Sequence, residues 1–221
     1  YRINSESLYQ IAQRPLDVIK KADPYLQEAP IHGWNPVWML GSHTGIILAA
    51  LGYQISEMES LLTQPHEWEH RLTELEAKYP EAARSVAFFR RYMKWPAERR
   101  LSRTESLLIK AATFTLDPTT LAMFGASEQT INIYDVIDKR QIVLVDMSGV
   151  IDTERRRFML MWLLSLVMSF IKHRGPGHHH SPLSLVIDEF SLLTHDEAFS
   201  QELDEMINVY SRSHRLWLTI A

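Results

Sequence analysis

The sequence contains no cysteine. Disulfides, thiolate metal sites and thiol nucleophiles are therefore excluded. The chain also has little excess charge, because its 221 residues carry a net charge of −4 at pH 7. No global attraction to nucleic acid or to an anionic membrane follows from that balance, although local patches can differ from the average. What is present, 46% hydrophobic and 23% charged residues, is typical of a globular protein with a sizeable core.

Long hydrophobic runs are absent as well. The longest candidate is residues 158–171, a run of 14 residues, whereas a membrane-spanning helix needs about 20. Basic residues close this run at both ends, at positions 155–157 and 172–174. We therefore predict a buried helix that is capped by Asp152, ends near Arg174 and lies beneath a sheet.

A complete phosphate-binding loop of the form G-x-x-x-x-G-K-[ST] is missing too. The nearest approach is Gly41-Ser-His-Thr-Gly45, which follows the apolar residues 37–40 and precedes the apolar residues 46–51. No Lys and Ser/Thr pair follows the second glycine, and the two glycines stand one position too close together. We expect this segment to begin a helix, with phosphate binding as the alternative.

The first half of the chain has the apolar spacing of helices. Residues 5–21 predict a helix kinked at Pro15, and residues 55–116 predict helices interrupted at Pro65, Pro80 and Pro96. Up to about residue 128 no segment is typical of a strand. We therefore expect an all-α domain over residues 1–128.

Charge is divided unevenly within this helical part. Residues 57–81 contain seven acids and two bases, whereas residues 84–110 contain eight bases and two acids. Basic residues interleaved with aromatic ones suit a nucleic acid, whose backbone and bases they can contact. The alternative is that the acidic helix packs against the basic one and the aromatic residues form core. Under the first interpretation the phosphate contacts are Arg90, Arg91, Lys94, Arg99 and Arg100.

The pattern changes after residue 128. Residues 131–133 are a short strand candidate and residues 141–146 a stronger one. The long apolar helix, a loop, a strand over residues 183–187, an amphipathic helix and a last strand from Leu216 follow in that order. Strands that alternate with helices indicate a parallel sheet built from right-handed crossovers. We assign residues 129–221 to an α/β domain.

The strand over residues 183–187 ends in two adjacent acids, Asp188 and Glu189. Its apolar residues predict a buried strand inside the sheet. Two carboxylates at the end of such a strand repel each other unless a cation or a water network lies between them. This is the arrangement that a magnesium–nucleotide site needs. A solvated acidic turn is the alternative.

The order of these segments resembles a known family. Residues 142–148 (IVLVDMS), the long helix ending at Arg174, residues 184–190 (SLVIDEF) and residues 210–221 (YSRSHRLWLTIA) are similar to the back half of the motor domain of HerA/FtsK-type ATPases. Within them the chain is most similar to the coupling proteins of conjugation and type IV secretion. The resemblance covers residues 100–221 well and the helical region loosely. It implies an α/β fold, part of a RecA-like parallel sheet, preceded by an all-α domain.

The resemblance also implies roles for three residues. Asp188 would be the Walker B acid that holds Mg²⁺, and Glu189 would orient the hydrolytic water as general base. Arg212 would reach the nucleotide of a neighbouring subunit, where its cation stabilises charge on the transferring phosphoryl group. The alternatives are a structural turn for the two acids and a helix-end cation for Arg212.

Cofactors, partners and location follow from the same resemblance. It implies ATP and Mg²⁺ as cofactors of the full-length protein. It implies DNA, the neighbouring subunits of a homo-hexamer, and secretion-channel or relaxosome proteins as partners. The protein would act in the cytoplasm, anchored to the cytoplasmic face of the inner membrane by a segment upstream of this chain.

One departure from the family is important. The Lys-bearing glycine loop, which in this family lies upstream of the helical domain, is not in the sequence. We therefore expect a fragment of a longer motor that hydrolyses no ATP by itself. The alternative function is a non-catalytic helical module that recognises a partner protein or relaxosome, with the α/β part as its scaffold.

Overall fold

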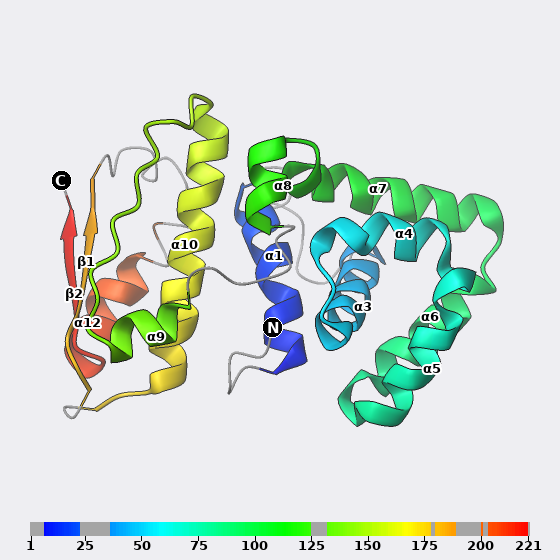
Figure 1. Ribbon diagram of the computed structural model, residues 1–221, viewed down its shortest axis with the longest axis horizontal. Helices are drawn as coiled ribbons and strands as arrows, with labels where there is room; N and C mark the ends of the chain where they lie inside the picture. Colours follow the sequence, from blue (N-terminus) through cyan, green and yellow to red (C-terminus); the bar gives the residue numbers. More distant parts are fainter. Residues whose placement is uncertain are drawn as a thin grey trace. The chain divides into compact units, whose positions relative to one another are not determined.

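The computed structural model describes residues 7–22, 36–124, 132–177, 180–188, 200 and 203–220. The chain divides into two compact units, one formed by residues 1–19 and 29–129 and the other by residues 20–28 and 130–221. In its described residues the first unit is helical, whereas the second combines helices with two strands (Figure 1). The mixed α/β class predicted from the sequence is confirmed at this level.

The first unit is a succession of helices, and from Pro36 to Phe124 the connections between them are short. The helices are α1 (Leu8–Ala22), α3 (Pro36–Leu51), η1 (Ile55–Glu57), α4 (Met58–Thr63), η2 (Pro65–Trp68), α5 (Glu69–Lys78), η3 (Pro80–Ala82), α6 (Ala83–Met93), α7 (Ala97–Thr115) and α8 (Pro118–Phe124). The helices are interrupted at the three prolines where the sequence predicts interruptions. Pro65 and Pro80 each begin a short 3-10 helix, and Pro96 is the N-cap of α7. Proline is tolerated there because the first N–H groups of a helix have no intrahelical acceptor.

The glycine-containing segment around residue 43 lies in the middle of α3, so the predicted helix start at this point is wrong. Both glycines serve close packing against α1. A Cβ on Gly45 would lie 3.0 Å from the Ala12 Cβ, and one on Gly41 would lie 2.9 Å from the Leu16 Cδ2. No glycine loop forms, so this segment offers no phosphate cradle.

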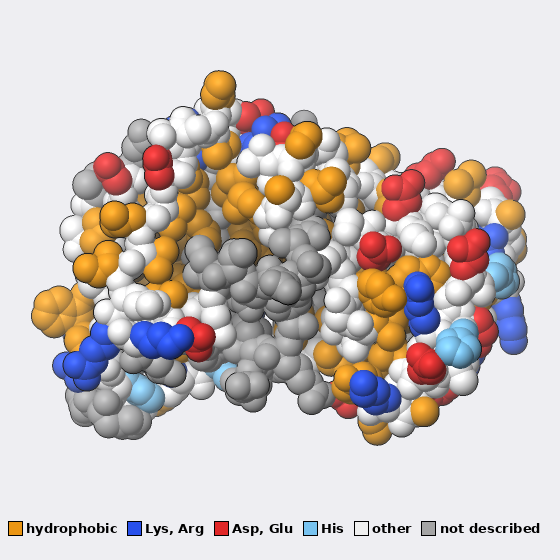
Figure 2. Space-filling view, in the orientation of Figure 1, with side chains coloured by type: hydrophobic (Ala, Val, Ile, Leu, Met, Phe, Trp, Pro, Cys, Tyr) orange, Lys and Arg blue, Asp and Glu red, His pale blue; other side chains and the backbone are white. Residues whose placement is uncertain are grey.

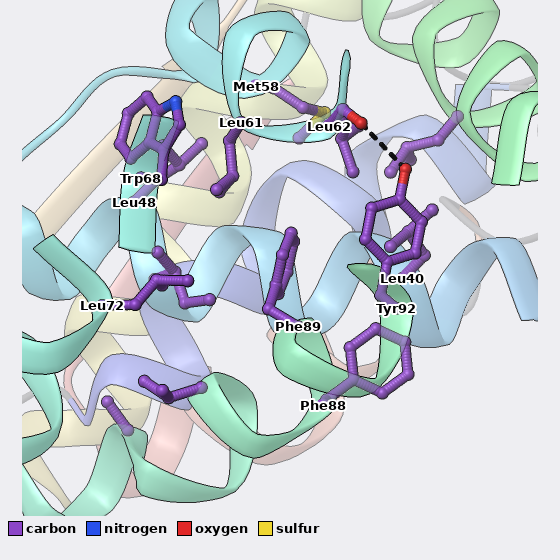
Figure 3. Close-up of a cluster of buried hydrophobic side chains, with 14 of the residues drawn as sticks. Leu40, Leu48, Met58, Leu61, Leu62, Trp68, Leu72, Phe88, Phe89 and Tyr92 are labelled. Carbon is purple, nitrogen blue, oxygen red and sulfur yellow. Dashed lines mark hydrogen bonds between the residues drawn. The ribbon is translucent and has the colours of Figure 1, made fainter. Parts of the chain in front are cut away.

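The core of the first unit gathers large side chains from α3 to α7. Trp68, Phe89 and Tyr92 are almost fully buried among leucines (Figure 3). The Tyr92 hydroxyl donates to the Leu62 carbonyl at 2.9 Å and shares a hydrogen bond with the Thr104 hydroxyl at 2.6 Å. A buried phenol needs such partners because an unpaired hydroxyl is costly in a core.

The second unit carries the sheet. Its elements are α9 (Ile133–Asp138), α10 (Thr153–Arg174), β1 (Leu183–Ile187), the π-helix η5 (Met206–Tyr210), α12 (Ser211–Ser213) and β2 (Leu216–Ile220). The strands β1 and β2 are parallel, and their register runs from the Leu183–Leu216 pair to the Ile187–Ile220 pair. Residues 203–213 are helical and lie between the strands in sequence. The predicted parallel pairing of these two strands is confirmed.

Helix α10 is the predicted apolar helix. The Asp152 carboxylate accepts a hydrogen bond from the Arg155 N–H at 2.9 Å, which is the predicted N-cap. The last residue of the helix is Arg174, and its C-cap is Gly175, whose φ of 67° is readily adopted only by glycine. Within the described ranges, no helix is both long and apolar enough to cross a membrane.

Two strand predictions are wrong. Residues 141–146 form no strand, and Ile142 and Leu144 are 88% and 89% exposed. Of the candidate at 131–133, residue 131 lies outside the described residues and Ile133 begins α9. A β-branched, apolar segment has the propensity for a strand, but a strand exists only when its backbone pairs with a neighbour.

The position of β1 also differs from the prediction of an interior strand. Its side chains alternate between half-buried or buried and exposed, and Val186 is 66% exposed. Among the described residues β1 pairs with β2 alone. One face of this pair is therefore covered and the other is open, which is the pattern of a sheet with a single packed face.

Candidate nucleic-acid interface and sheet-edge carboxylate

Asp188 directly follows β1 and is exposed at the carboxyl end of that strand. Because β2 is parallel to β1, the carboxyl ends of both strands meet at the same edge of the sheet. Ligands of open parallel sheets bind outside this edge. Glu189, the predicted general base, lies outside the described residues.

Arg212 lies in α12 and is exposed, close to the start of β2. The start of β2 pairs with Leu183, at the amino end of β1. Strands of five residues span about 17 Å, so Arg212 and Asp188 lie toward opposite edges of the same sheet. One chain therefore does not bring these two predicted residues together.

The described residues contain no group of three or more His, Asp or Glu side chains that could hold a metal ion. Mg²⁺ is usually held by only one or two carboxylates, with water and substrate phosphates as its other ligands. Asp188 fits that limited role. It does not form a closed metal site by itself.

The amino edge of the sheet is held by two arginines. Arg174 donates to the carbonyls of Ser181 and His214, and Arg215 donates to the carbonyl of His180 at 3.0 Å. Burial and the nearby charge of Arg215 lower the pKa of Arg174. Burial, with the charges of Arg174 and His180, also lowers the pKa of His214. These contacts tie the end of α10 to both strands and are structural.

In the helical unit, Arg90 forms two ion pairs. It donates from Nε to Glu69 at 3.0 Å and from Nη1 to Glu76 at 2.6 Å. These hydrogen bonds raise the pKa of Arg90. The acidic helix α5 thus packs against the basic helix α6, which is the alternative interpretation of the charge pattern. Figure 2 likewise shows acidic and basic side chains side by side over this unit.

The aromatic residues of α6 are core rather than surface. Phe88, Phe89 and Tyr92 are 4% exposed or less. Trp95 is half-buried, and the Arg99 guanidinium lies 4.3 Å from the centroid of its ring. Only Trp95 of these four rings is therefore accessible enough to meet a ligand.

The other predicted phosphate contacts remain on the surface. Arg91, Lys94 and Arg99 are exposed, whereas Arg100 is half-buried and donates to the Met93 carbonyl at 3.2 Å. Arg91 follows Arg90 in sequence but points elsewhere, because successive residues of a helix are rotated by about 100°.

The structure adds Arg84, which the sequence analysis missed. Arg84, Arg91 and Lys94 are spaced by seven and three residues, so they follow one face of α6, and all three are exposed. We call these three residues the α6 stripe. Within the part of the chain that the structure describes, none of the three forms an ion pair. The helical spacing in the sequence could have identified Arg84.

His43 of α3 packs against the same helix. Its ring stacks on Phe88 with the centroids 4.2 Å apart, and its Nδ1 lies 3.0 Å from the Ser85 hydroxyl. Burial, together with the charges of Arg84 and Arg91, lowers the pKa of His43 to about 4. The ring is therefore neutral at pH 7 beside two cations that form no ion pair with any described residue.

Comparison with known proteins found no matching family model, no matching curated protein and no matching solved structure.

Proposed function

We propose that this chain is the Walker B-bearing segment of an ATP-driven motor that moves DNA, or a protein–DNA substrate, in conjugation or type IV secretion. The observation that carries the proposal is the exposed Asp188 at the carboxyl end of a parallel strand. P-loop ATPases place the acid that holds their magnesium at this point. In the complete motor, β1 and β2 would belong to a RecA-like sheet.

The proposed roles follow the positions of the residues. Asp188 would hold Mg²⁺ through water, and Glu189 would orient the attacking water. Arg212 would act on the nucleotide of a neighbouring copy, which its distance from Asp188 within one chain supports. The phosphate cradle would come from an upstream segment of the longer protein. A homo-hexamer in the cytoplasm, anchored at the inner membrane and contacting channel or relaxosome proteins, is part of the same proposal.

ATP hydrolysis by the full-length motor tests the proposal. We expect Asp188→Asn and Glu189→Gln each to lower DNA-stimulated turnover by at least 100-fold, because metal binding and water orientation are lost. Asp146→Asn is the matched control. Asp146 also follows an apolar segment, but it is exposed and accepts a hydrogen bond from the Ser148 N–H at 2.8 Å, which an Asn oxygen can also accept.

Two results would contradict the proposal. Turnover that survives both substitutions would show that these acids are not catalytic. ATP hydrolysis by the 221-residue chain alone, dependent on Glu189, would show that the chain is no fragment of a motor.

A non-catalytic binding module is the second candidate. The observation that favours it is that the helical unit has its own core and presents on α6 a basic stripe that forms no ion pair with any described residue. In that case the unit would recognise a partner protein or relaxosome, and the α/β unit would be its scaffold. If the chain is such a module, the Asp188→Asn variant should bind the partner as well as wild type does, and the full-length protein should hydrolyse no ATP.

A further inference from the structure

The ring of His43 packs on the part of α6 that lies between Arg84 and Arg91 in the sequence. Phe88, on which the ring stacks, is one turn beyond Arg84 and one turn before Arg91. Arg84 and Arg91 are about 10.5 Å apart along the helix axis. The residue on which the imidazole stacks therefore lies between the two arginines along the helix, and both arginines are close enough to affect the pKa of the ring.

Two neighbouring cations lower the pKa of His43 in addition to its burial. Arg84 and Arg91 act on His43, and both come from α6. Helix α3 carries no charged residue, and among the described residues of the other helices packed on it (α1, α4, α5 and α7) none is a group that shifts the pKa of His43. Burial is the main cause of the lowered pKa of His43, and the two arginines add to it because a proton on the ring would be a third positive charge at this place.

An anion bound by the two arginines reverses this balance. A phosphate between Arg84 and Arg91 neutralises the charges that oppose protonation and attracts a third cation. The imidazolium donates from both ring nitrogens, so Nδ1 can donate to the Ser85 hydroxyl while the other nitrogen carries the added proton.

The shape of the surface suits a nucleic-acid backbone. From Arg84 to Lys94 the stripe extends about 15 Å along α6, which is long enough to meet more than one phosphate of a nucleic-acid strand. The partly accessible ring of Trp95, covered by Arg99, lies at the Lys94 end. Base stacking on an aromatic ring beside such cations is typical of nucleic-acid surfaces.

We propose that His43, Arg84 and Arg91 form a phosphate-binding site for a nucleic-acid strand on α6, in which His43 takes up a proton as the phosphate binds. This inference rests on the proposed handling of DNA and adds a residue and a form of regulation to it. The affinity for the strand then increases as the pH falls. The increase is larger than the attraction between the arginines and the phosphates would give without the proton on His43.

Nuclear magnetic resonance of the histidine rings in the 221-residue chain tests this coupling. The signal of His43 among the 10 histidines is assigned by its loss in His43→Phe, a variant that keeps an aromatic ring on Phe88. With a 12-nucleotide single strand at low salt, we expect the pKa of His43 to rise by about two units, from about 4 to about 6. The double variant Arg84→Ala/Arg91→Ala should abolish that rise, whereas Arg90→Ala should leave it unchanged.

Affinity measurements complete the test. Between pH 7.5 and 5.5 the wild-type chain should gain at least 3-fold more affinity for the strand than His43→Phe, with His43→Gln as a second variant. DNA binding without any change at His43 overturns the inference and leaves the motor intact. Absence of DNA binding at low salt also overturns it, and the effect of Asp188→Asn on ATP hydrolysis then decides the proposed function separately. Equal binding of polyglutamate would assign the surface to an acidic protein and overturn the nucleic-acid partner.

Discussion

Two neighbouring arginines on α6 have opposite environments. Arg90 faces α5 and binds two carboxylates, whereas Arg91 is exposed and forms no ion pair within the described residues. The difference arises from the rotation of the helix between successive residues. Residue type alone therefore does not tell a structural cation from one available to a ligand.

Substituting these two arginines separates the roles. Arg90→Ala should lower the free energy of unfolding by about 1 kcal/mol, because two half-exposed ion pairs are lost. Arg91→Ala should change stability by less than about 0.5 kcal/mol and weaken DNA binding several-fold. Urea unfolding and fluorescence anisotropy measure the two effects. A stability loss confined to Arg91→Ala would contradict this assignment.

His43 makes the stability of the helical unit depend on pH. Its pKa is about 4 in the folded chain and 6.5 as the ordinary value. A histidine with a lowered folded pKa stabilises the fold above pH 6.5, and this contribution is lost as the pH falls from 6.5 toward 4. Since the ring is half-buried, we expect a loss of about 1–2 kcal/mol. Urea midpoints between pH 7 and 4.5 should fall more steeply for wild type than for His43→Phe, and parallel slopes would contradict the prediction.

At the scale of the element, α3 and α1 are held together by small residues. Gly45 approaches the Cβ and the carbonyl of Ala12 so closely that an added Cβ would lie 3.0 and 3.1 Å from them. The glycines that suggested a phosphate loop are thus explained by helix packing. Their cost to helix propensity is offset by the close contact they permit.

A larger side chain at this contact should be destabilising. Gly45→Leu should lower the free energy of unfolding by about 2–3 kcal/mol, because overpacking outweighs the gain in helix propensity. Gly149→Ala is the control, since a Cβ there meets nothing within 4 Å, and should be neutral within about 0.5 kcal/mol. Melting temperatures report both. An unchanged melting temperature for Gly45→Leu would mean that α1 does not pack on α3 at this point.

At the scale of the whole molecule, the average charge and the local charge disagree. The chain is net negative at −4, yet the α6 stripe is positive and unpaired within the described residues. Screening in salt limits the electrostatic effect of each exposed charge to a distance of about 8–10 Å. Any attraction of DNA to this chain must therefore come from local contacts.

DNA binding by the whole chain should accordingly depend steeply on salt. Three phosphate contacts predict a slope of log K against log salt of about −2 for a single strand. The variant Arg84→Ala/Arg91→Ala/Lys94→Ala should reduce the slope to near zero, whereas Arg90→Ala should leave it unchanged. Fluorescence anisotropy titrations from about 25 to about 200 mM salt measure this slope, because the salt dependence of such binding is large in that range. A slope that the triple variant does not alter would place the DNA contacts elsewhere.

The sequence by itself determined the local features. Pro65, Pro80 and Pro96 each stand at or just before the start of a helix, and Asp152 caps α10. These outcomes depend on neighbours in the chain, so periodicity and capping chemistry suffice to predict them.

Only the tertiary structure decided the features that depend on a partner. It covered the Arg90 side of α6 with an acidic helix and left the Arg84 side open, it placed the glycines of α3 against α1, and it left residues 141–146 without a paired strand. The physical reason is the same in each case. Ion pairs, close backbone contacts and strand pairing are made between segments distant in sequence, and no local pattern specifies which segments meet.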